Sequence, residues 1–139
     1  MSDLPASRAP HSGFARLHSG PTAYVERGAG EVVVLIHGVG LNADAWEPQI
    51  AELSQRYRVI ALDMLGHGHS GAPPANADLS AFVEQLRQLL DDLAIPSANV
   101  IGHSMGGLVA IGFALAHPSR TLRLAVLNSV YERDELRRV

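Results

Sequence analysis

Residues 99–107, N-V-I-G-H-S-M-G-G, are the most informative part of the sequence, because a short apolar run turns sharply there into an apolar helix. Asn99–Gly102 is typical of a buried strand, and Met105–His117 of a largely apolar helix that Pro118 stops. Ser104 lies in the turn, with glycines at 102 and 106. In so tight a crossing, a side chain at either glycine position would collide with the neighbouring backbone.

The Ser104 hydroxyl is a candidate nucleophile. G-x-S-x-G between a strand and a helix is typical of the strained turn that projects a catalytic serine at the carboxyl ends of a parallel sheet. The Met105 amide would then open the helix, where N–H groups and the helix dipole stabilise a developing oxyanion. The alternative is a glycine-rich turn with an incidental serine, since the pattern alone is weakly specific. Its position between strand and helix favours the nucleophile.

A second oxyanion donor is predicted after the most apolar run, Val32–Ile36, which His37-Gly38-Val39-Gly40 follows. Glycines let the backbone approach a reacting carbonyl closely. We predict the Val39 amide as the donor and Gly40 as the less favoured choice. A plain turn at a strand end is the alternative.

Outward from these motifs, strands and helices alternate along the chain. We expect strands over Phe14–His18, Thr22–Glu26, Val32–Ile36, Arg58–Asp63 and Leu122–Asn128, and helices over residues 44–57 and 80–93. Capping-box spacing at Asp44–Glu47 predicts the start of the first helix, and Ser80 is the predicted cap of the second. Glycine and proline predict a loop over residues 66–76. The alternation predicts an α/β fold with a doubly wound, mostly parallel sheet.

Composition fits one globular domain and excludes several classes of protein. The chain has 139 residues, of which 47% are hydrophobic and 18% charged, enough for an ordinary core. A net charge of −3 without a basic block gives nucleic-acid binding no electrostatic basis. The absence of cysteine excludes disulfides, thiolate metal sites and a cysteine nucleophile.

The ends of the chain and its apolar stretches bear on location. Residues 1–12 have no apolar core typical of a secretory signal, and we expect a flexible lead-in there, with the domain over residues 13–139. The longest apolar stretch, Met105–Ala116, has twelve residues, whereas a membrane span needs about 20. We therefore expect no membrane association and a cytoplasmic location.

Three motifs, taken in order, resemble those of the α/β-hydrolase family. They are H-G-V-G at 37–40 with Trp46 shortly after, D-M-L-G-H-G-H-S-G at 63–71 and G-H-S-M-G-G at 102–107. With their flanking strands they cover about residues 20–130. The resemblance is closest to a bacterial branch of carboxylesterases, enol-lactonases, C–C bond hydrolases and cofactor-free haloperoxidases. These members share the motifs, which therefore do not choose among them. Haloalkane dehalogenases are disfavoured because they have aspartate at the position of Ser104.

The resemblance implies that Ser104 is the nucleophile, that the Met105 and Val39 amides form the oxyanion hole, and that no cofactor is needed. It also implies a set of structural positions around the site, namely His37, Gly38, Asp63, His67, Gly102 and Gly106. Asp63, His67 and His69 suggest zinc ligands, but a further ligand at suitable spacing is missing, and we predict no metal. His103 is expected to pack away from the pocket. An apolar acyl pocket or the core could hold Leu41, Trp46, Met64 and Leu65.

The base and the acid of a catalytic triad have no credible candidate. In this family the order along the chain is serine, acid, histidine. His117 is the only histidine after Ser104, and a helix of that length puts it about 18 Å away. The late acids Glu132, Asp134 and Glu135 crowd into the last eight residues, and Asn128 stands where some relatives have the acid.

We therefore expect the amino-terminal part of a hydrolase, with about six of the family's eight strands. The base and acid would come from sequence beyond residue 139, so the isolated chain is expected to be inactive. A complementing carboxyl-terminal half or a second chain is the expected partner. The last strand should leave an apolar edge unpaired.

The hypothesis is a serine hydrolase acting on a small carboxylic ester or lactone. The alternative is a non-catalytic ligand-sensing or interaction module on the same fold. A dinucleotide-binding domain is a poor third choice, because no G-x-G-x-x-G follows the first strand of the unit.

Overall fold

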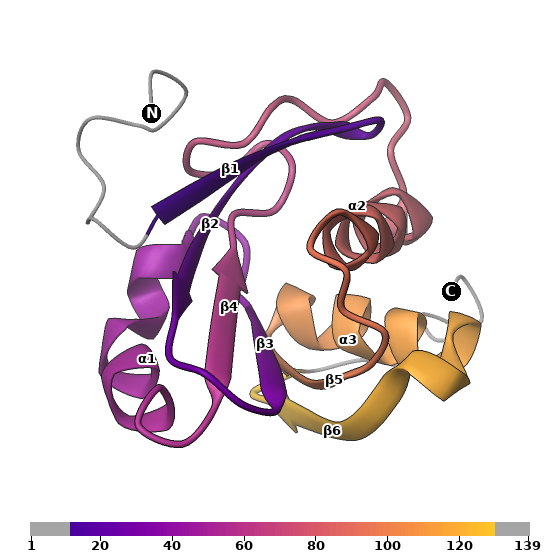
Figure 1. Cartoon of the computed structure of the whole chain (residues 1–139). Coiled ribbons are helices and arrows are strands. Elements are labelled where there is room, and N and C mark those ends of the chain that lie inside the picture. The colour runs from indigo at the N-terminus through magenta and orange to yellow at the C-terminus, as the bar shows by residue number, and fades with distance from the viewer. Residues whose placement is uncertain (1–11, 130–139) are drawn as a thin grey trace.

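A computed structural model describes residues 12–129 and shows one twisted sheet with helices on both faces (Figure 1). The strands are β1 (Ser12–Leu17), β2 (Gly20–Arg27), β3 (Val32–Ile36), β4 (Arg58–Leu62), β5 (Ala98–His103) and β6 (Thr121–Leu127). The helices are α1 (Glu47–Leu53), α2 (Leu79–Asp92) and α3 (Met105–Ala116), with short 3₁₀ turns η1 (Ala43–Trp46) and η2 (Pro118–Arg120).

The sheet has the order β1-β2-β4-β3-β5-β6. β3 pairs in parallel with β4 and β5, and β5 pairs in parallel with β6. Within residues 12–129, only the β1–β2 and β2–β4 pairs are antiparallel. The mostly parallel α/β sheet is confirmed, and it brings the carboxyl ends of β3, β5 and β6 to one edge.

β3 lies inside the sheet, and all five of its residues are buried. Its side chains enter two separate cores because successive residues of a strand point to opposite faces. Val34 and Ile36 belong to the core with α2 and α3, whereas Val33 and Leu35 pack with η1 and α1. Helices on both faces account for the burial of the whole run.

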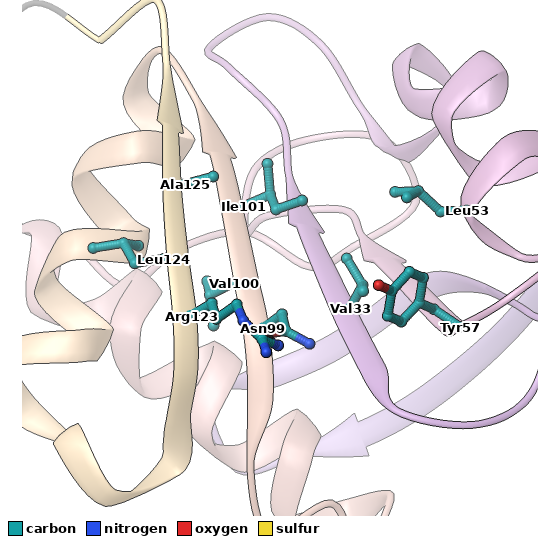
Figure 2. Close-up of a pocket in the computed structure, with 9 residues that line it drawn as sticks. All are labelled: Val33, Leu53, Tyr57, Asn99, Val100, Ile101, Arg123, Leu124 and Ala125. Atoms are coloured by element: carbon teal, nitrogen blue, oxygen red, sulfur yellow. Dashed lines mark hydrogen bonds between the residues drawn. The ribbon is translucent and has the colours of Figure 1, made fainter.

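β6 is the outermost strand on the other side of β5. Leu122, Leu124 and Leu127 are exposed by 49%, 43% and 45%, which confirms the predicted apolar edge within the described residues. Figure 2 shows the neighbouring face of the sheet, where Ile101 and Ala125 lie across from Leu53 beside a hollow of about 380 Å³.

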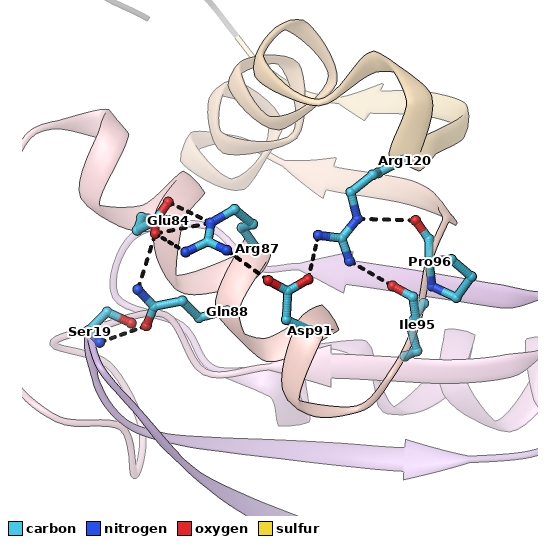
Figure 3. Close-up of polar contacts among 8 residues, drawn as sticks. All are labelled: Ser19, Glu84, Arg87, Gln88, Asp91, Ile95, Pro96 and Arg120. Carbon is cyan, nitrogen blue, oxygen red and sulfur yellow. Dashed lines mark hydrogen bonds and ion pairs between the residues drawn. The ribbon is translucent and has the colours of Figure 1, made fainter.

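A chain of polar contacts ties α2 to the start of β6 (Figure 3). Arg120 donates to the carbonyls of Ile95 (2.7 Å) and Pro96 (3.1 Å) and pairs with Asp91 (2.6 Å). Arg87 pairs with the other carboxylate oxygen of Asp91 at 2.7 Å. The contacts hold two connections together: the one from α2 to β5 and the one from α3 to β6.

The predicted single helix over residues 44–57 is wrong. The Asn42 side chain accepts from the Asp44 amide at 2.9 Å and caps η1, and α1 starts only at Glu47. Pro48 lies in the first turn of α1, where its missing N–H is tolerated. The chain therefore forms a 3₁₀ turn followed by a short α-helix, and the capping box at Asp44 does not form.

Other local predictions also need correction. Asp78, not Ser80, caps α2, since its carboxylate accepts from the Ser80 amide at 3.0 Å. Gly20 pairs with Leu17, so the turn between β1 and β2 is shorter than the gap between the predicted strands Phe14–His18 and Thr22–Glu26. The remaining strand ends differ by one or two residues, as hydrogen-bond pairing often extends beyond the apolar run.

β1 begins at Ser12, and the rest of the predicted lead-in lies outside the described residues. None of the helices within residues 12–129 has the length and apolar content required to span a bilayer. The cytoplasmic location stays a prediction.

Candidate active site

Ser104 sits in a strained turn between β5 and α3, with φ 56° and ψ −121°. A residue with a side chain rarely adopts this conformation, which costs on the order of 1–3 kcal/mol and persists only where neighbours enforce it. The strand–turn–helix context predicted for Ser104 is confirmed.

Two glycines make this turn possible. A Cβ added at Gly102 would collide with the carbonyl of Gly106, and one at Gly106 would collide with the carbonyl of Ile36 in β3. The backbone of the turn therefore presses directly on β3. Both positions therefore lack room for a side chain, as the sequence predicts.

The H-G-V-G turn after β3 runs beside Ser104. A Cβ added at Gly38 would lie only 3.1 Å from Ser104 Cβ. The turn is closed by a hydrogen bond from the Leu41 amide to the Gly38 carbonyl at 3.2 Å, and Gly40 has φ 78°. The segment that carries the Val39 amide thus adjoins the serine, and the Met105 amide opens α3 on the other side.

His37 is buried and hydrogen-bonded through both ring nitrogens. Its Nε2 accepts from the Met64 amide at 2.9 Å, so Nδ1 carries the proton and donates to the Gly38 carbonyl at 2.8 Å. The His67 ring lies 5.0 Å from the His37 ring, centroid to centroid. These contacts connect the turn after β3 to the loop after β4. Both nitrogens of the His37 ring are already used in hydrogen bonds to the backbone.

Asp63 fastens two loops through its carboxylate. Oδ1 accepts from the Ala43 amide at 2.8 Å and Oδ2 from the His69 amide at 2.9 Å. A Cβ at Gly68 would collide with this carboxylate. Within residues 12–129 there is no group of three or more side chains suited to hold a metal ion.

A hollow of about 250 Å³ flanks the turn. Leu41, Trp46, His103 and Asn128 are among its lining residues, and Ser104 itself is not. The His103 ring meets Trp46 edge-on, with centroids 6.5 Å apart, so the expectation that His103 packs away from the pocket is wrong. The larger hollow of Figure 2 is lined by residues of β3, α1, β5 and β6, among others, and by no residue of the turn.

The structure separates the four apolar residues for which the sequence allowed either a pocket or a core position. Leu41 and Trp46 line the hollow, whereas Met64 and Leu65 are fully buried in the core. Gln49 also lines the hollow and was missed by sequence reasoning. Its position three residues after Trp46, one helical turn along the same face, was the available signal.

The family of the chain follows from comparison with known proteins. Residues 31–139 match the family described as alpha/beta hydrolase fold. The chain belongs to the α/β-hydrolase family.

Relatives of this α/β hydrolase have several activities. Over 83% of the chain it is 47% identical to an (E)-2-((N-methylformamido)methylene)succinate hydrolase of Acinetobacter baylyi, covering 44% of that protein. Over 76% of the chain it is 41% identical to the non-heme chloroperoxidase CPO-A1 of Kitasatospora aureofaciens, covering 39% of that protein. The enol-lactonase of Burkholderia xenovorans superposes with a TM-score of 0.81 at 33% identity, over 84% of this chain and 46% of the lactonase. The chain thus spans less than half of each relative.

Proposed function

We propose that this α/β hydrolase is a serine hydrolase that cleaves a small carboxylic ester or lactone through an acyl-enzyme on Ser104. The observation that carries the proposal is the strained conformation of Ser104, enforced by glycines on both sides and placed against the Gly38 turn. A backbone held in this unfavourable region is typical of functional sites. The similarity to hydrolases, one of them an enol-lactonase, supports the class of reaction.

The proposed mechanism uses two backbone amides of this chain. Ser104 Oγ attacks the acyl carbon while its proton passes to a base, and the carbonyl oxygen becomes an oxyanion. The Met105 and Val39 amides donate to that oxyanion, which is worth several kcal/mol per donor in a site that excludes water. Collapse expels the alcohol, which takes the proton from the base. A water molecule then hydrolyses the acyl group from Ser104.

The base and the acid are proposed to come from sequence outside residues 1–139. His117 lies at the far end of α3 from Ser104, and the His37 ring is committed to two backbone groups. Turnover therefore belongs to the whole protein, in which a carboxyl-terminal half or a second chain completes the triad. We expect residues 1–139 alone to show no turnover.

A hollow of about 250 Å³ adjoins the turn through His103, the residue before Ser104, and is a candidate to receive one part of a bound substrate. Leu41 and Trp46 offer apolar contact, and the Gln49 amide can fix one polar group. We propose that these residues receive the part of the substrate next to the scissile bond.

A fluorophosphonate probe tests the proposal on the full-length protein. The probe should label Ser104, identified by peptide mass spectrometry, and labelling should vanish in Ser104→Ala and in heat-denatured protein. The alternative of a ligand-sensing module predicts a folded protein that is not labelled. Absence of labelling in the folded wild-type protein would overturn the proposed function.

A further inference from the structure

The end of β6 and the residues just after it form hydrogen bonds with the backbone of Ser104. The Ser104 amide donates to the Leu127 carbonyl at 2.9 Å, and the Ser129 hydroxyl donates to the Ser104 carbonyl at 2.6 Å. The Gly107 amide donates to the same carbonyl at 2.9 Å. Both polar backbone groups of the strained residue are thus held, and Ser129 contributes the shortest of the three bonds.

Gly107 explains how Ser129 reaches that carbonyl. It is the last glycine of G-H-S-M-G-G and has no place in the G-x-S-x-G argument. A Cβ at position 107 would collide with Ser129 Oγ and lie 2.8 Å from Val126 Cγ1. Gly107 therefore leaves the space that the Ser129 hydroxyl occupies.

The backbone at Asn128 completes this arrangement. Asn128 has φ 52°, a left-handed conformation that asparagine tolerates better than most residues. The resulting bend lets the carbonyl of Leu127 and the side chain of Ser129 both meet Ser104. The contact is thus built by three features: a bend, a glycine and a hydroxyl.

The bond from Ser129 acts on the peptide unit that carries the Met105 amide. A peptide unit is planar and trans, so its C=O and N–H point in opposite directions. Holding the Ser104 carbonyl therefore fixes where the Met105 N–H points. A hydrogen bond to the carbonyl also polarises the peptide and makes the N–H a better donor.

We propose that Ser129 is a positioning residue that orients the Met105 amide toward the oxyanion of the reaction. The inference rests on the proposed function, because it requires an oxyanion beside Ser104. Ser129 acts through the peptide bond between Ser104 and Met105 and does not itself need to touch the substrate. Its effect should fall on the chemical step, because the oxyanion forms only there.

Steady-state kinetics of Ser129→Ala in the full-length protein test this role. Loss of one positioning hydrogen bond should lower kcat roughly tenfold while KM changes little. Ser129→Thr keeps the hydroxyl and should stay within about threefold of wild type. Active-site titration with the fluorophosphonate, run to completion, normalises each rate to folded and competent sites.

Ser54→Ala is the matched control. The Ser54 hydroxyl also donates to a backbone carbonyl, that of Ala51 at 3.3 Å, at the exposed end of α1. Its kcat should equal that of wild type.

Two results would overturn the role of Ser129. One is a wild-type kcat in Ser129→Ala, and the other is an equal loss in the alanine and threonine variants. If instead wild-type Ser104 is never labelled, the proposed function itself fails, so the two failures are distinguishable.

Discussion

β3 and β6 flank the same strand, yet their environments are opposite. Both pair in parallel with β5, which leads into Ser104. All residues of β3 are buried between helices, whereas most of β6 is exposed, including three leucines. The leucines of β6 are as apolar as the residues of β3, so their exposure depends on what covers the strand.

The two strands also hold Ser104 differently. β3 restrains the turn by steric contact, because Gly106 passes against the Ile36 carbonyl. β6 and the residues just after it restrain the turn by hydrogen bonds: the Leu127 carbonyl accepts from the Ser104 amide, and the Ser129 hydroxyl donates to the Ser104 carbonyl. Steric contact sets where the turn can lie, and directional bonds set how its peptide units point.

The largest loss of activity is expected at Ser104, which both β3 and β6 hold in place. Ser104→Ala removes the proposed nucleophile but no packing, so kcat of the full-length protein should fall by roughly 10³-fold or more while stability changes little. Rates on a simple ester and thermal unfolding, measured on the same preparation, check this. Turnover at the wild-type rate would mean that the turn serves another purpose.

A paired substitution tests the contrast between the strands directly. Leu35→Ala in β3 removes a fully buried side chain and should destabilise the chain of residues 1–139 by about 2–5 kcal/mol. Leu124→Ala in β6, exposed by 43%, should cost roughly 1 kcal/mol or less. Denaturant unfolding measures both. Equal costs would contradict the difference in burial.

Gly106→Ala tests the steric support from β3. The added methyl group would meet the Ile36 carbonyl, a backbone atom that cannot rotate away, so the turn or β3 must shift. We expect a loss of about 1–3 kcal/mol and slower labelling of Ser104. Gly40→Ala is a comparison with open space around its Cβ but positive φ, so its cost should reflect backbone strain alone.

The smallest effect is expected from an ion pair that joins the start of β3 to β6. The Glu31 carboxylate, next to β3, accepts from Asn99 at 2.7 Å and from Arg123 of β6 at 3.0 Å. The pKa of Glu31 is lowered mainly by the hydrogen bond from Asn99 and to a smaller extent by the charge of Arg123. Its contribution to stability is therefore present above the ordinary glutamate pKa and is lost as pH falls through the lowered value.

Glu31→Gln should remove this pH dependence. The Tm of the variant should lie slightly below that of wild type at pH 7, and the two should converge in acid. A gap that stays constant or widens in acid would contradict the sign of the pKa shift.

Sequence reasoning succeeded where the signal is local and repeated. Val32–Ile36 is a continuous apolar run, and the glycines around Ser104 constrain the turn within a few residues, so both were found. The caps were misassigned because Asn42 and Asp44, like Asp78 and Ser80, are two residues apart and each can cap a helix.

Contacts between distant residues were beyond the reach of the sequence. Ser129 meets Ser104 across 25 positions, and only the pairing of β5 with β6 brings them together. His103 was misplaced for a similar reason, since its pocket position depends on Trp46 in η1. Side-chain roles set by tertiary packing required the structure.

Trapping the acyl-enzyme tests the nucleophilic role of Ser104. Full-length protein would be quenched in acid during turnover of a small ester, digested and analysed by mass spectrometry. We expect an acyl group on Ser104 in the peptide that carries G-H-S-M-G-G, and none in Ser104→Ala. Turnover without acylated Ser104, in an enzyme whose Ser104→Ala variant remains active, would contradict it.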